Sequence, residues 1–279
     1  LTGDGRDAAT YEKAMKVMKD LQGSSPDIRL MLAELYVGRQ EWPAVRAELE
    51  QATRMNPRLV RAWEALVTVD FRERKRELAE DHVRILLTLD PENFTGNLML
   101  ASFQYSRGQY SLAESSYRTA LAARRDPTAL NDLAYLLMIN KSGALAEARA
   151  LIEEALARQP GNALFLSTRG ELNLREGRYD EAERDLQQVL AEMPDNAQVL
   201  LLSAQLYAAR GQKDAAREMA ETLADRQGEL PPEQQEQLQE LLRDMVRDGT
   251  ISTLLISSHI FEDLEEVADE VLVLRHGAL

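Results

Sequence analysis

Side chains able to perform acid–base or metal chemistry are few in this sequence. It holds three histidines, His82, His259 and His276, and no cysteine. None of these histidines has another histidine or an acid at metal-ligand spacing on a shared helical face, and the lack of cysteine removes thiolate sites. Adjacent acids such as Glu153 and Glu154 fall on solvated helix faces. We therefore predict no enzyme, no metal site and no cofactor.

Phosphate chemistry is not supported either. The glycine-rich motif G-x-x-x-x-G-K-[ST], which cradles nucleotide phosphates, does not occur. Lys and Arg number 33 against 47 Asp and Glu, and the resulting net charge of −14 repels nucleic acid phosphates and anionic membrane surfaces. No run of eighteen apolar residues is present to cross a membrane. The predicted partner is a protein or peptide, with no nucleic acid and no direct membrane insertion.

The elements that would hold such a partner are marked by regularly spaced prolines. Successive gaps between them are 31, 34, 36, 33 and 34 residues. A fixed period of this length indicates a stack of similar helical units, whose usual product is a long surface that holds another polypeptide. The prolines are Pro26, Pro57, Pro91, Pro127, Pro160 and Pro194.

Small residues recur in register with the prolines, where two helices must approach closely. A first series comprises Ala33, Ala101, Ala134, Gly170 and Ala204, with Val67 as the exception, and a second comprises Ala79, Ala113, Ala148, Ala182 and Ala216. Glycines such as Gly108 and Gly177 suit the turns between the helices. Residues 178–194 show apolar positions at helical spacing, and each proline is expected to end a unit.

This pattern resembles the tetratricopeptide repeat family over about residues 11–228. The resemblance implies an all-α, right-handed superhelical solenoid of helix pairs, with a short β-α-β-like C-terminal tail. We divide the chain into a partial leading repeat (1–25, second helix only), six repeats (26–228), a capping or junction helix (229–249) and a C-terminal segment (250–279). Residues 67–77 lack a turn glycine, and the loops at 122–127 and 138–143 are lengthened.

In this family the first helix of each unit lines the concave groove. The resemblance then places these side chains in it: Arg61, Glu64, Thr68, Arg72, Leu98, Ser102, Tyr105, Asn131, Tyr135, Met138, Ser167, Glu171, Arg175, Leu201 and Gln205. Some relatives grip a peptide carboxylate with Lys, Arg and Asn, but Arg61, Arg72 and Asn131 are sparse and far apart. The alternative for any single residue is a solvated helix face. Tyr105 and Tyr135 are favoured, because aromatic rings anchor extended peptides well.

The last thirty residues break the repeat. They read as strand, helix and strand, and resemble the end of the ATPase domain of ABC transporters, through Ser257, Ser258 and His259, then FEDLEEVAD and VLVLRHG. The resemblance makes His259 the switch histidine, a vestigial nucleotide contact. The other ATPase motifs are missing, so this chain alone is not expected to hydrolyse ATP. We favour a remnant or junction, against a piece of a domain completed elsewhere or a segment docked on the last helix.

The predicted function is a non-catalytic protein–protein interaction scaffold that binds a peptide or partner protein in the groove. One alternative is a regulatory or accessory part of an ABC transport system, with a transporter subunit as partner. A second is an organiser of an envelope or polysaccharide export assembly. The start lacks a methionine and a signal peptide and looks cut. The cytoplasm is favoured over the periplasm as the compartment, and the exposed end helices offer a surface for self-association.

Overall fold

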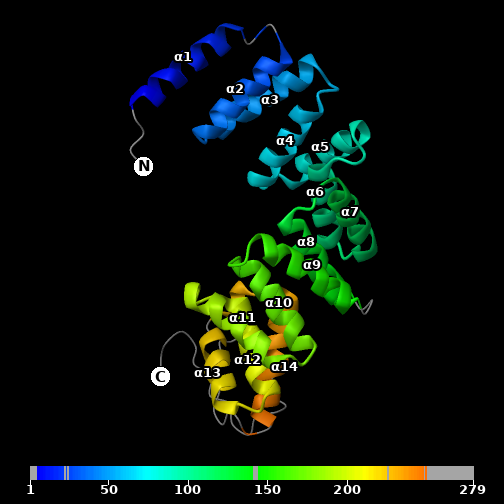
Figure 1. Cartoon of the computed structure of the whole chain (residues 1–279), viewed down its shortest axis with the longest axis vertical. Coiled ribbons are helices and arrows are strands. Elements are labelled where there is room, and N and C mark those ends of the chain that lie inside the picture. The colour runs from blue at the N-terminus through cyan, green and yellow to red at the C-terminus, as the bar shows by residue number, and fades with distance from the viewer. Residues whose placement is uncertain are drawn as a thin grey trace, which may run out of the picture. The chain divides into compact units, whose positions relative to one another are not determined.

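The computed structural model describes residues 5–249 except residues 22, 24, 141–143, 225 and 248, with side chains from residue 11 onward apart from those of 224, 227 and 246. All regular secondary structure in this part of the chain is helical (Figure 1). The all-α solenoid prediction is confirmed. The predicted β-α-β segment at 250–279 and His259 lie outside the described residues.

The chain divides into two compact units, residues 1–140 and 141–279. The first unit holds α1 (Gly5–Leu21), α2 (Pro26–Gly38), α3 (Trp42–Met55), α4 (Val60–Arg72), α5 (Arg76–Leu89), α6 (Phe94–Ser106), α7 (Tyr110–Ala123) and α8 (Pro127–Ile139). The second holds α9 (Leu145–Arg158), α10 (Ala163–Arg175), α11 (Tyr179–Glu192), α12 (Ala197–Ala209), α13 (Lys213–Ala224), the short 3₁₀ helix η1 (Gln227–Glu229) and α14 (Pro232–Arg247).

Consecutive helices pack as pairs within each unit. In the first unit α2 packs on α3, α4 on α5 and α6 on α7, and in the second α10 packs on α11 and α12 on α13 (Figure 1). The small residues predicted at close helix approaches are buried, and a Cβ on Gly170 would stand 2.8 Å from Leu186 Cδ2. Side chains such as Leu66 and Leu133 are fully enclosed between helices. The sequence periodicity therefore places the core correctly.

The prolines take two positions rather than one. Pro57 and Pro91 each lie two residues beyond the end of a second helix, as expected for residues that cannot continue it. Pro26 and Pro127 instead begin α2 and α8, behind the N-caps Ser25 and Asp126. Proline suits the first helical position because its nitrogen needs no acceptor there. These two prolines open a unit, which corrects the expectation that each proline ends one.

Left-handed backbone conformations recur in the turns between paired helices. Gly108, Gly177 and Gly211 have φ of 70–72°, as predicted for the first two of them. Gln40 and Arg74 adopt φ of 59° and 57° at the equivalent turns of the first two pairs. The charged turn at 67–77 therefore keeps the repeat geometry without a glycine, at a conformational cost.

Replacing Arg74 by glycine is expected to raise the free energy of unfolding by ~0.5–1 kcal/mol, because glycine adopts positive φ without steric penalty. The Arg74 side chain is exposed. Gly108→Ala is the matched control and should destabilise, since nothing lies within 4 Å of an added Cβ and only the backbone opposes it. Urea denaturation measures both, and an unchanged or less stable Arg74→Gly variant would contradict the expectation.

Ion pairs recur at five of the interfaces between a second helix and the end of the following first helix. Every pair joins residues 27 positions apart, and the order of the charges changes from one interface to another. Because the spacing equals neither a helical turn nor the full repeat, it reflects the stacking of successive units. The pairs are Glu12–Arg39, Arg46–Glu73, Glu80–Arg107, Arg149–Glu176 and Glu183–Arg210.

Candidate functional site

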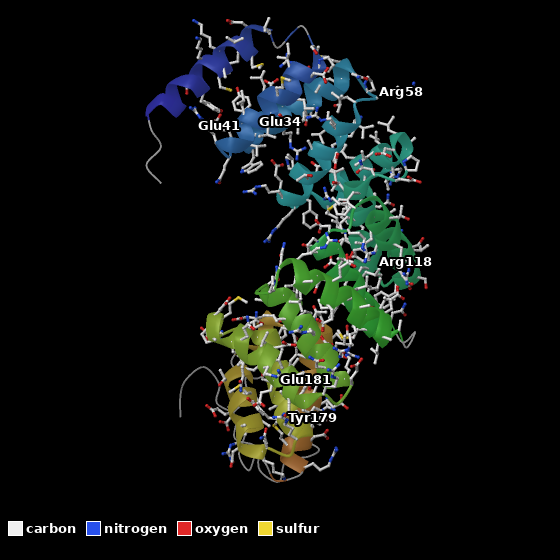
Figure 2. The ribbon with its side chains drawn as sticks, viewed as in Figure 1. Glu34, Glu41, Arg58, Arg118, Tyr179 and Glu181 are labelled. Carbon is white, nitrogen blue, oxygen red and sulfur yellow. The ribbon has the colours of Figure 1, made fainter. Side chains whose placement is uncertain are left out.

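Four of the predicted groove residues line one cavity in the first unit. Arg61, Glu64, Thr68 and Arg72 project from successive turns of α4 into a cavity of about 540 Å³ between α2, α3 and α4. Glu34 on α2 completes the polar part of the lining and is labelled in Figure 2. The helical spacing on α4 thus places these side chains together, and their binding role stays a prediction.

The rest of this cavity is apolar. Two of its lining side chains are largely open to solvent, since Phe71 is 52% exposed and Val37 is 43% exposed. Large exposed apolar side chains that share one cavity mark a binding surface more often than isolated ones do. The apolar lining residues are Leu30, Ala33, Val37, Trp42, Val45, Leu49, Ala65, Val69 and Phe71.

Most charges around the cavity are already matched. Arg61 pairs with Glu34 at 3.1 Å, and Glu64 accepts a hydrogen bond from Thr95 Oγ1 at 2.6 Å. The guanidinium of Arg72 stacks 3.8 Å from the ring centroid of Trp42 and makes no ion pair within the described residues. The stack fixes Arg72 at the cavity edge through a cation–π contact.

A second group of predicted groove residues forms a tyrosine cluster farther along the first unit. The ring centroid of Tyr105 on α6 lies 6.5 Å from that of Tyr135 on α8 and 5.7 Å from that of Tyr110 on α7. Leu98 and Ser102, also on α6, are partly buried. The two tyrosines favoured from the sequence therefore lie in contact range of each other.

Two other groove predictions on α8, Asn131 and Met138, are 3% and 5% exposed. Between the turns that carry Asn131 and Tyr135 lies Asp132, a partly buried acid that the sequence analysis did not single out. Its one hydrogen-bond donor among the described groups is Asn131 Nδ2, at 3.4 Å. Burial raises the pKa of Asp132 to about 6, against a smaller lowering by Asn131.

The groove predictions in the second unit are mostly covered. Ser167, Glu171 and Leu201 are 7%, 8% and 1% exposed, and Gln205 hydrogen-bonds to Gln237 of α14. Burial raises the pKa of Glu171, while the hydrogen bond from the exposed Arg175 lowers it. These residues offer a partner less surface than their counterparts on α4, and their role stays a prediction.

The described side chains form no arrangement suited to acid–base or metal chemistry. His82 Nδ1 lies 2.6 Å from Asp70 Oδ2, and Arg46 binds the other oxygen of that buried carboxylate. No group of three metal-ligating side chains occurs among the described residues. None of the helices described is both long and apolar enough to span a bilayer. His82 is a packed helix residue, with 13% of its side chain exposed.

Comparison with protein families identifies the helix pairs in two stretches of the chain. Residues 98–163 and residues 173–242 each match a family model described as tetratricopeptide repeat. The chain contains tetratricopeptide repeats. Comparison with curated proteins gives no match.

Solved structures show the same solenoid fold at low sequence identity. PilF of Pseudomonas aeruginosa is 20% identical with a TM-score of 0.60, covering 78% of this chain and 98% of its own. PilW, a widely conserved type IV pilus biogenesis factor, is 21% identical with a TM-score of 0.58 and the same coverage. YrrB, a tetratricopeptide repeat protein with an unusual peptide-binding site, is 18% identical with a TM-score of 0.52, covering 63% of this chain and 91% of its own.

Sequence reasoning missed several residues of these sites. Trp42 was not among the predicted groove residues, yet it lines the cavity and its ring stacks against Arg72. Phe71 and Val37 fall at the ends of their helices, outside the predicted set. An exposed apolar residue in the last turn before a tetratricopeptide turn is the signal that would have found them. Asp132 gives no such signal, because an acid in a helix is ordinary on a solvated face.

Proposed function

We propose that this protein is a non-catalytic interaction scaffold that binds a segment of a partner polypeptide in the first unit, at the cavity between α2, α3 and α4. The tetratricopeptide matches support the scaffold. The observation that carries the site is the apolar cavity of about 540 Å³ with Phe71 and Val37 open at its edge. A bulky apolar side chain of the partner would enter it and bury both.

The chemistry of the lining explains why a polypeptide is the favoured ligand. Apolar walls supply the affinity, since burial yields about 25 cal/mol per Å² of apolar surface removed from water. Polar groups at the edge, the Arg61–Glu34 pair and the stacked Arg72, supply hydrogen-bond donors and acceptors for a peptide backbone. An aromatic or aliphatic anchor surrounded by such a polar rim is the usual composition of a protein interface.

The first unit is preferred over the second for a structural reason. In the second unit α14 packs against α12 and α13, with Leu238 and Leu242 fully buried. The chain's own helix thereby covers surface that the predicted groove would offer there. The cavity of the first unit keeps its apolar edge exposed.

The test is selection of peptides from a randomised twelve-residue phage library against the purified protein. Selected peptides should carry a large apolar residue, and Phe71→Ala should weaken their binding about tenfold, the loss expected when a contact worth about 1.4 kcal/mol is removed. Leu112→Ala is the matched control, because Leu112 is 55% exposed and lies on α7 away from the cavity. Failure to enrich peptides, or equal loss in both variants, would refute the site.

A further inference from the structure

Asp132 on α8 is an acid whose charge is not matched within the described structure. It makes no ion pair there, and its one hydrogen bond, from Asn131 Nδ2, is long at 3.4 Å. The arginine of the neighbouring helix α7, Arg118, forms its ion pair with Glu114 and not with Asp132. A partly buried carboxylate without a cation costs stability. Buried carboxyl groups with perturbed pKa values cluster at functional sites.

A structural role for Asp132 does not account for it. The capping position of α8 is taken by Asp126, whose side chain accepts hydrogen bonds from the backbone of Thr128 and Ala129. Asp132 stands six residues further on, beyond the first turn, where a carboxylate gains little from the helix dipole. Its neighbour Asn131 also carries a buried oxygen, Oδ1, that has no hydrogen-bond donor among the described residues. One acceptor, Asn131 Oδ1, thus lacks a donor among the described residues, and the adjacent Asp132 has only a long hydrogen bond.

Aromatic rings surround the same part of the first unit. Asp132 and Tyr135 are three residues apart on α8 and so share one helix face. Tyr135 contacts Tyr105. Burial raises the pKa of Tyr117 on α7, and the charge of Asp132 and the nearby Tyr105 add to that rise. Acid and rings therefore lie within one neighbourhood formed by α6, α7 and α8.

We propose that Tyr105, Tyr135 and Asp132 form a site for a basic side chain, lysine or arginine, of the partner polypeptide. A cation is attracted to the faces of tyrosine rings, and a carboxylate beside them adds a charge-assisted hydrogen bond. The net charge of −14 favours approach of a basic partner. This inference deepens the proposed function, because it rests on a polypeptide partner and names a residue type that it carries.

The experiment uses the full protein with 13C-labelled tyrosine and a probe that needs no known partner. Nα-acetyl-lysine methylamide is titrated at pH 7.5 while the ring resonances of Tyr105 and Tyr135, assigned by single Tyr→Phe variants, are followed by NMR. The neutral norleucine analogue, of the same length, is the comparison probe, and the arginine analogue tests the second basic side chain. We expect the lysine or arginine probe to bind about tenfold more tightly than norleucine.

Two variants separate this site from general electrostatic attraction. Asp132→Asn should abolish the preference for the basic probe. Asp126→Asn removes the same charge from the same helix, keeps a residue that caps well, and should leave the preference intact. Equal binding of basic and norleucine probes, or equal behaviour of the two variants, would overturn the proposal. The readout is the ring resonances of Tyr105 and Tyr135, which do not line the α2–α4 cavity, so this result is distinguishable from failure of the phage selection.

Discussion

Replacing Arg46 by methionine is expected to lower the free energy of unfolding of the first unit by about 3 kcal/mol. Asp70 is completely buried, and Arg46 donates to its Oδ1 at 2.6 Å and to Glu73 at 2.7 Å. Methionine keeps much of the packing volume but leaves the Asp70 carboxylate without its guanidinium partner and with the ring nitrogen of His82 as its remaining polar neighbour. Loss of one partner of a buried pair is costly, because the other charge stays out of water.

The measurement is urea unfolding of the whole protein followed by tryptophan fluorescence. Both tryptophans of the chain, Trp42 and Trp63, lie in the first unit and report its unfolding. Arg107→Met is the matched control, because it breaks the equivalent pair with Glu80 at a position where the Arg107 side chain is 48% exposed. That change should cost less than about 1 kcal/mol.

A second variant tests the cause of the Arg46 effect. Adding Asp70→Asn to Arg46→Met removes the stranded charge and should recover most of the lost stability, since deleting both partners of a buried pair is often nearly neutral. Equal stability of the Arg46→Met and Arg107→Met variants would show that burial of Asp70 does not govern the interface. No recovery in the double variant would point to lost packing instead.

The helix pairs were predictable because their causes are local in sequence. Small residues such as Ala101 and Ala113 must lie where helices touch, and a turn such as that at Gly108 needs positive φ; both signals repeat with the period of the fold. Charged interfaces were not predictable in the same way. Arg46 and Glu73 are 27 residues apart, and nothing in the sequence shows that they meet until the stacking of successive units is known.

The candidate site was predictable only in part, for a related reason. Helical spacing identified the α4 residues that point into the cavity, such as Arg61 and Thr68. It could not distinguish open from covered faces, because Glu171 and Leu201 have the same register but are buried in the second unit. Whether a groove is covered depends on contacts between distant segments, here those of α14 with α12 and α13.

Asp132→Asn is expected to stabilise the protein at neutral pH by about 3 kcal/mol, because each unit of pKa shift corresponds to 1.36 kcal/mol. The ordinary pKa of this group is 3.8, and burial raises the pKa of Asp132 to about 6 in the folded state, with Asp126 adding to the rise and Asn131 opposing it. The folded state therefore binds this proton more tightly than the unfolded state. Stability from Asp132 should fall as pH rises from about 4 to about 6, and stay low above that.

Comparison of wild type and variant isolates this effect from the other acids. Arginine and lysine partners lower the pKa of Glu73 and Glu80, so their stabilisation has the opposite sign and is lost as pH falls. These contributions are common to both proteins and cancel in the difference between their urea midpoints, followed by tryptophan fluorescence from pH 4 to 8. The difference should grow from near zero at pH 4 to its full value above pH 7.

The sign of this difference separates a binding residue from a structural one. A carboxylate that held α8 in place would make Asp132→Asn less stable at neutral pH, whereas a carboxylate that awaits a cation makes it more stable and unable to prefer the basic probe. Saturating basic probe should stabilise the wild type, because it binds the folded state and lowers the pKa of Asp132. It should leave the Asp132→Asn variant unchanged, and a variant that is less stable at pH 7 would contradict the assignment.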